Sequence, residues 1–271
     1  MSDDRRPLDD HLDDHRVAHD VARAAGELLL ALRRELQDQG APSWALEDEG
    51  DRRAHRLIVE ALDELRPDDA VLSEEGRDHP YAMNATRAWI VDPLDGTREF
   101  GEGRDDWAVH VALVDDHRPI AGAVALPAMG LTLATDPAPP PPPRHEGPPR
   151  LVVSRSRPAA ITYENADEIG GVLVPLGSAG ATAMAVVLGQ AEVYAHAGGQ
   201  YEWDSCAPVA VAAAAGLHVS RIDGSPLRYN RPDPWLPDLL ICRPDLAPSI
   251  TALVRRCIGS QIEDTEAWLW P

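Results

Sequence analysis

Two carboxylates stand close together in the segment WIVDPLDGT, which spans residues 89–97. A hydrophobic stretch leads to Asp92, a proline is expected to turn the chain, and Asp95 follows three residues after the first aspartate. Two carboxylates around a turn, with the backbone carbonyl of Leu94 between them, supply the oxygen ligands that Mg²⁺ prefers. The pattern favours a magnesium site, and an ordinary turn capped by an aspartate side chain is the alternative.

Other residues add to this chemistry. Gly96 and Thr97 offer backbone N–H groups where a helix could begin, which is a common place for a bound anion. Glu74 follows a predicted strand in the segment SEEG, and Asp204 stands at the start of a predicted helix in EWDSCAP. Taken singly, paired glutamates are usually solvated and an aspartate at a helix start is usually an N-cap. The combination is more specific than its parts.

Hydrophobic periodicity predicts the elements that position these residues. In the first half we expect helices over residues 16–36 and 51–65, and strands over 70–73, 88–91, 108–114 and 120–125. In the second half we expect strands over 151–154, 172–175 and 192–195, and alanine-rich helices over 179–188 and 204–215. Because strands and helices alternate in the second half, that half is expected to be α/β.

A proline-rich segment divides the chain. Residues 137–149 hold eight of the 25 prolines, which favours a stiff surface loop over a ligand for an SH3-type domain. We therefore expect an N-terminal α+β subdomain with the metal-binding motifs over 1–136, and a C-terminal α/β subdomain that completes the site over 150–271.

The composition excludes some classes of binding partner. The 271 residues are 44% hydrophobic and 26% charged, as in ordinary globular proteins. With 45 acidic and 25 basic residues, the net charge of −20 repels nucleic acids and anionic membranes. There is no apolar run of transmembrane length or signal-peptide type, and the three cysteines show no CxxC spacing. We expect a cytoplasmic protein with reduced cysteines that binds neither nucleic acids nor membranes and is either a monomer or a homodimer.

The segments LSEEG, WIVDPLDGT and EWDSCAP together resemble the motifs of the inositol monophosphatase superfamily of Mg²⁺-dependent, lithium-sensitive phosphatases. The resemblance extends over nearly the whole chain, through GRDDWAVHVALV, LVVSRSRP and GSAGATAMAVVLGQAEVY. The SRS element, the EWD triplet and DGSPLRYN look most similar to the CysQ branch of actinobacterial type. Members of that branch hydrolyse 3′-phosphoadenosine 5′-phosphate to AMP in sulfate assimilation. The resemblance implies an α/β (α+β) fold layered as an αβαβα sandwich.

The resemblance also implies a set of metal ligands. Glu74, Asp92 and the carbonyl of Leu94 would hold one Mg²⁺ ion, and Asp92, Asp95 and Asp204 would hold a second. Two or three such ions would reverse the negative charge of the site, and a phosphate dianion could then enter.

Catalytic roles follow from the same resemblance. Asp51, at the start of its helix, would orient Thr97 and lie beside a third, loosely bound ion. Glu74 and Thr97 would position the attacking water, and the amides of Gly96 and Thr97 would bind the phosphate oxygens. The stretch LEDEGD at 46–51 departs from the Thr-x-Ala-Asp pattern usual in the family, which leaves the surroundings of the third ion open.

The sequence specifies the substrate pocket less closely than the metal ligands. Ser178, Gly199 and Gln200 match positions that line the nucleoside pocket in relatives. Thr182 replaces a lysine common in nucleotidase relatives, and a histidine replaces an arginine. The candidates to bind the non-scissile phosphate are Arg155, His196, Arg228 and Arg231.

Three functions remain open at this point. The favoured one is hydrolysis of 3′-phosphoadenosine 5′-phosphate. The second is hydrolysis of a sugar phosphate, inositol 1-phosphate or fructose 1,6-bisphosphate. The third is a non-catalytic acidic binding protein, which the intact acidic ligands and DGT motif disfavour.

Overall fold

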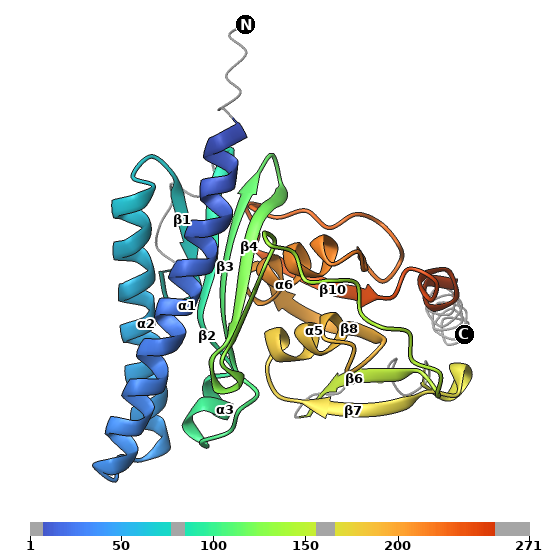
Figure 1. Cartoon of the computed structure of the whole chain (residues 1–271), viewed down its shortest axis with the longest axis horizontal. Coiled ribbons are helices and arrows are strands. Elements are labelled where there is room, and N and C mark those ends of the chain that lie inside the picture. The colour runs from blue at the N-terminus through green and yellow to red at the C-terminus, as the bar shows by residue number, and fades with distance from the viewer. Residues whose placement is uncertain (1–7, 77–84, 156–165, 253–271) are drawn as a thin grey trace, which may run out of the picture.

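The computed structural model describes residues 8–76, 85–155 and 166–252 (Figure 1). Helices α1 (Leu8–Asp38) and α2 (Ser43–Leu65) cover the outer face of a first sheet. Helices α5 (Ala179–Val187) and α6 (Glu202–Ala214) lie between that sheet and a second one. Short helical segments that begin at Ala166 and Ala247 pack on the outer face of the second sheet. This arrangement confirms the layered αβαβα fold.

The first sheet has the order β1-β2-β3-β4-β5, with β1 parallel to β2 and the other pairs antiparallel. Its strands are β1 (Ala70–Ser73), β2 (Arg87–Asp95), β3 (Ala108–Asp115), β4 (Arg118–Leu126) and β5 (Leu131–Ala134). The 3₁₀ turn η1 (Glu74–Gly76) follows β1, the short helix α3 (Thr97–Gly101) follows β2, and η3 (Pro127–Met129) follows β4. The acidic motifs therefore sit at the ends of two neighbouring parallel strands.

The second sheet has the order β7-β6-β8-β10-β9. Its strands are β6 (Arg150–Ser154), β7 (Val172–Leu176), β8 (Val193–Tyr201), β9 (His218–Ser220) and β10 (Trp235–Cys242). Strand β6 runs parallel to β7 and β8, while β10 is antiparallel to β8 and β9.

Side chains of the first sheet alternate between two cores, as the two-residue period of a strand requires. Trp89 and Val91 of β2 pack with α1 and α2, whereas Ile90 belongs to the core shared with α5, α6 and the second sheet. Asp92 and His110 have the same parity as Ile90 and therefore face α5 and α6. The fold thus directs one acidic residue of the motif into the middle of the sandwich.

Several element boundaries differ from those expected. Helix α2 begins at Ser43, so Asp51 lies in the middle of the helix rather than at its start. The reason is a stripe of buried residues at four-residue spacing that continues upstream of Asp51: Leu46, Gly50, Ala54, Ile58 and Leu62. The strand expected to end at Val91 continues past Pro93 to Asp95, because an irregular register takes up the proline. Strands β5, β9 and β10 have no counterpart among the sequence predictions.

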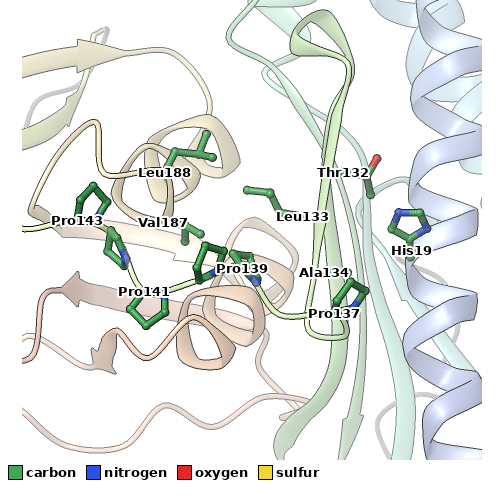
Figure 2. Close-up of a pocket in the computed structure, with 12 residues that line it drawn as sticks. His19, Thr132, Leu133, Ala134, Pro137, Pro139, Pro141, Pro143, Val187 and Leu188 are labelled. Atoms are coloured by element: carbon green, nitrogen blue, oxygen red, sulfur yellow. The ribbon is translucent and has the colours of Figure 1, made fainter.

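The proline-rich segment lies against the molecule near the end of α5 (Figure 2). Together with Leu133 of β5 and Val187 of α5, its prolines line a cavity of about 300 Å³, which His19 of α1 also reaches. Most of the segment is exposed, as expected of a surface loop. No helix in the described part of the chain is long and apolar enough to cross a membrane.

Candidate active site

The end of β2 holds the central motif in a bulged conformation. The register between β2 and β3 shifts between Asp92, which pairs with His110, and Asp95. The Asp92 carboxylate turns back to accept a hydrogen bond from the Leu94 amide (3.1 Å). The Thr97 hydroxyl donates to the Leu94 carbonyl (3.0 Å). The bulge therefore brings the two carboxylates and the expected carbonyl ligand into one short segment.

Asp95 connects the two halves of the molecule. Its two carboxylate oxygens accept hydrogen bonds from the amides of Ala179 (3.1 Å) and Gly180 (2.5 Å), at the N-terminus of α5. Its Oδ2 atom also lies 3.3 Å from Nε2 of His110. Burial alone would raise the pKa of Asp95, but the His110 charge, the Gly180 amide and the Ser178 hydroxyl lower it.

Carboxylates from several elements converge around Asp92. The pKa of this fully buried side chain is raised well above its ordinary value, first by burial and then by the charges of Glu74, Asp95 and Asp204. Burial and the charge of Asp95 likewise raise the pKa of Asp204 to about 7. Glu74, Asp95 and Asp204 therefore lie close enough to Asp92 for their charges to act on it, and their role as metal ligands stays a prediction.

Asp204 belongs to the first turn of α6 but is not its N-cap. The helix begins at Glu202, Tyr201 is the N-cap, and the Asp204 carboxylate accepts a hydrogen bond from the Tyr201 amide (2.6 Å). This reciprocal capping arrangement orients the carboxylate from the third position of the helix.

Asp51 belongs to the same acidic region. Burial and the charges of Glu75 and Glu74 raise its pKa to about 8. The hydrogen bond that the structure gives the Thr97 hydroxyl goes to Leu94, so the expected direct contact from Asp51 to Thr97 is not made between these described residues. The two residues lie on separate elements, α2 and α3, that pack together.

The donor set fits a hard divalent cation. It consists of carboxylate and carbonyl oxygens, which are the ligands that Mg²⁺ prefers. Neighbouring negative charges raise the pKa of Asp92 and of Asp204, and a bound cation would relieve this repulsion. Across residues 8–76, 85–155 and 166–252, no group of three or more His, Cys, Asp or Glu side chains is arranged so that it could hold a metal ion. Asp95 and Asp204 are turned toward backbone amides instead.

Residues predicted to bind substrate lie at the starts of α3 and α5 and on β8. Gly96 adopts a left-handed conformation (φ 87°), and a β-carbon there would lie 2.8 Å from the Ser178 side chain. Gln200 is buried, and its Nε2 atom has no hydrogen-bond partner among the described residues. His196 lies on the same strand, β8, where its Nε2 atom contacts the carbonyl of Gly199 (3.0 Å). Glycine is required at position 199, because a β-carbon would overlap the Trp235 ring.

The arginine candidates are engaged in other contacts or lie outside the cluster. Arg155 pairs with Asp106 (2.6 Å) and approaches Glu99 (3.7 Å). Arg231 pairs with the fully buried carboxylate of Glu202 (3.3 Å), and Arg228 is exposed. The His196 side chain has no carboxylate partner among the described residues, and the ring of its neighbour Tyr194 lies within the electrostatic reach of Asp95 and Asp204.

Sequence reasoning missed His110. This fully buried side chain lies across from Asp92 and between Asp95 and α6. Burial alone would lower its pKa, but the Asp95 charge and the contact with the Trp203 carbonyl raise it. The available signal was the alternation in WAVHVALV, which places a histidine inside an otherwise apolar strand, and the register with β2 shows that it shares the face of Asp92.

Comparisons with known proteins agree with this geometry. The inositol monophosphatase family matches residues 13–136 and 152–258. The chain is 47% identical to the 3′-phosphoadenosine 5′-phosphate phosphatase of Mycobacterium leprae, covering 94% of this chain and 98% of that protein. It is 35% identical to the 3′(2′),5′-bisphosphate nucleotidase CysQ of Escherichia coli K12, covering 69% and 80%. The crystal structure of CysQ from Bacteroides thetaiotaomicron superposes with a TM-score of 0.70 at 27% identity, covering 85% and 97%. The chain therefore belongs to the inositol monophosphatase family.

Proposed function

We propose that the chain hydrolyses 3′-phosphoadenosine 5′-phosphate to AMP and inorganic phosphate. The observation that carries this proposal is the 47% identity to the M. leprae phosphatase over almost the full length of both chains. The converged carboxylates at the ends of β1 and β2 and at the start of α6 support it. A role in sulfate assimilation and a cytoplasmic location belong to the same proposal.

The acidic side chains prepare the site for Mg²⁺. Glu74, Asp92 and the Leu94 carbonyl would hold one ion, and Asp92, Asp95 and Asp204 would hold a second. When bound, Mg²⁺ would supply charge neutralisation for the phosphate and lower the pKa of a nucleophilic water. Because these negatively charged carboxylates repel a phosphate dianion, they make substrate entry depend on the cation.

The loop after Asp95 is proposed to bind the scissile phosphate. The first amides of a helix lack partners within the helix, so the N–H groups of Gly96 and Thr97 can donate to phosphate oxygens. The Thr97 hydroxyl already lies beside the Leu94 carbonyl, next to the proposed cation ligands. From there it would orient the attacking water together with Glu74, and Asp51 would support this geometry from α2.

The nucleoside part of the substrate is assigned to β8 and the start of α5. Gln200 offers a buried amide donor without a protein partner in the described chain. Ser178 lies beside Gly96, and His196 is proposed to contact the phosphate that is not cleaved. Of the three earlier arginine candidates, two would have to exchange a carboxylate partner for a phosphate, which makes them weaker candidates.

A phosphate-release assay tests the proposal. We expect Mg²⁺-dependent hydrolysis of 3′-phosphoadenosine 5′-phosphate with a kcat/KM at least about 100-fold above that for inositol 1-phosphate or fructose 1,6-bisphosphate. Asp95→Asn should reduce this activity by at least about 100-fold, because it removes a charged ligand without a large change in volume. Asp63→Asn, which neutralises an exposed aspartate on α2, is the matched control and should retain full activity.

Two results would contradict the proposal. A preference for either sugar phosphate would favour the second function. No phosphate release from any of the three substrates at saturating Mg²⁺ would favour an acidic binding protein.

A further inference from the structure

His110 occupies a central position that the proposed reaction leaves without a role. It lies on β3 directly across from Asp92, so the two side chains project from the same face of the sheet toward α5 and α6. The side chain is completely buried. Burying an imidazole is unfavourable unless its polar atoms find partners, so its contacts need an explanation.

The two ring nitrogens of His110 contact two different parts of the proposed metal site. Nε2 lies 3.3 Å from Oδ2 of Asp95, an ion-pair distance without an aligned hydrogen bond. Nδ1 lies 3.0 Å from the carbonyl oxygen of Trp203, which directly precedes Asp204. The ring therefore lies between the Asp95 carboxylate on β2 and the α6 backbone that carries Asp204, and these two aspartates would share the second cation.

Helix α5 packs closely against His110 and Asp95. A β-carbon at Gly180 would lie 2.1 Å from Nε2 of His110 and 3.0 Å from Oδ2 of Asp95, so the absence of a side chain makes room for both groups. The Gly180 amide donates to the same Asp95 oxygen. A histidine that served only to fill space would not need its ring nitrogen enclosed together with a carboxylate.

We propose that His110 is a positioning residue that sets the orientation of Asp95 relative to Asp204 and thereby the affinity of the site for Mg²⁺. Partners of this kind, one shell outside the ligands, typically change metal affinity by about 10- to 100-fold when they are removed. The inference rests on the proposed function, because it assumes that Asp95 and Asp204 hold a cation.

Two substitutions at His110 separate its contacts. An asparagine amide can occupy the place of Nδ1, so His110→Asn can keep the contact with the Trp203 carbonyl but not the one with Asp95. A glutamine amide reaches the place of Nε2, so His110→Gln can donate to Asp95. His117→Asn is the matched control, because His117 also contacts a backbone carbonyl through Nδ1, that of Tyr229 (2.8 Å), and its positive φ (65°) suits asparagine.

The readout is Mg²⁺ binding to the full chain without substrate, measured by calorimetry and by the Mg²⁺-dependent rise in melting temperature. We expect His110→Asn to weaken Mg²⁺ binding by at least about 10-fold, and His110→Gln to stay within about 3-fold of the unmodified chain. His117→Asn should bind Mg²⁺ normally. In activity assays, His110→Asn should need a higher Mg²⁺ concentration for half-maximal activity, with little change in KM for the substrate.

Each other outcome has a definite meaning. If the unmodified chain binds no Mg²⁺, the proposed function fails. If it binds Mg²⁺ and both His110 variants bind equally well, with lowered melting temperatures only, His110 is a packing residue and the inference is overturned. If His110→Asn does not fold, Gly180→Ala replaces it, because the added methyl displaces the ring from Asp95 without removing the imidazole. Unchanged Mg²⁺ binding by that variant would overturn the inference.

Discussion

At the scale of single residues, the acidic motif carries most of the predictable chemistry. A strand, a proline and a second aspartate three residues later suffice to predict a carboxylate pair, and the structure places Glu74 and Asp204 around that pair. His110 could not be assigned in this way. A histidine within an apolar strand is most often a satisfied core residue, and only the register with Asp92 shows what it faces.

Gln200 gives a prediction at this scale. An unpartnered buried amide destabilises a fold by about 1–3 kcal/mol, so it is expected to persist where a ligand uses it. We expect Gln200→Leu to raise KM for 3′-phosphoadenosine 5′-phosphate by about 10-fold, with kcat within about 3-fold, because the lost hydrogen bond is made in both ground and transition states. Steady-state kinetics at saturating Mg²⁺ measures this.

Melting temperatures separate this role from a structural one. If the Gln200 amide has no ligand, Gln200→Leu should raise the melting temperature and leave KM unchanged, which would remove Gln200 from the substrate pocket. Gln37→Leu, at an exposed position of α1, controls for the change from amide to apolar side chain.

At the scale of elements, the spacing of apolar residues predicts most strands and helices. It does so because one or both faces of each element are buried. The pattern fails where polar or small residues interrupt it. Strand β10 contains Pro237 and Asp238, and the second half of β8 contains Gly198 and Gly199, so neither segment resembles a continuous strand. Asp238 is tolerated inside β10 because its carboxylate pairs with Arg221 and accepts the Ile222 amide.

The junction of β8 and α6 depends on a buried glutamate. The fully buried carboxylate of Glu202 accepts hydrogen bonds from the amides of Asn230 (2.5 Å) and Arg231 (3.2 Å), and it fixes that segment beside the helix that carries Asp204. The Asn230 side chain extends the contact to the Ala85 carbonyl, just before β2 (2.6 Å). Glu202 and Asn230 together therefore connect three segments that are distant in the sequence.

We expect Glu202→Gln to lower the free energy of unfolding by about 1.5–3 kcal/mol, because hydrogen bonds to a charged acceptor are lost and an amide group faces backbone donors. For a chain of this size, that corresponds to a fall in melting temperature of roughly 3–10 °C. The loosened segment should also be cleaved faster in limited proteolysis near residues 228–234. An unchanged melting temperature, equal to that of the exposed control Glu64→Gln, would show that the buried carboxylate is not a structural connection.

At the scale of the whole molecule, the site exists only when both sheets pack together. Residues of the first sheet, such as Ile90 and Val124, share one core with Met184 of α5 and Trp203 of α6. The contact from Asp95 to the amides of α5 joins residues that are 84 and 85 positions apart. Local sequence patterns carry no information about such a pairing, and neither periodicity nor the motifs predicted it.

Because acidic groups are buried close together, the free energy of unfolding of the metal-free protein depends on pH. The pKa of Asp51 is raised to about 8 and that of Asp204 to about 7, in both cases first by burial, from an unfolded value near 3.8. Between about pH 5 and 8 the unfolded chain has released these protons while the native state still holds them. The unfolded state therefore binds fewer protons, and the free energy of unfolding falls as the pH rises through this window.

We expect the melting temperature in EDTA to fall by at least about 5 °C between pH 5.5 and pH 8.0. Mg²⁺ should raise it more at pH 8.0 than at pH 5.5, because a cation binds the ionised carboxylates and competes with their protons. Histidines also titrate in this range, so the comparison that isolates the two acids is the double variant Asp51→Asn, Asp204→Asn, whose melting temperature in EDTA should depend much less on pH. Asp63→Asn should behave like the unmodified chain. A metal-free melting temperature that is equal at both pH values, or that rises with pH, would show that burial and neighbouring charges do not hold these carboxylates protonated.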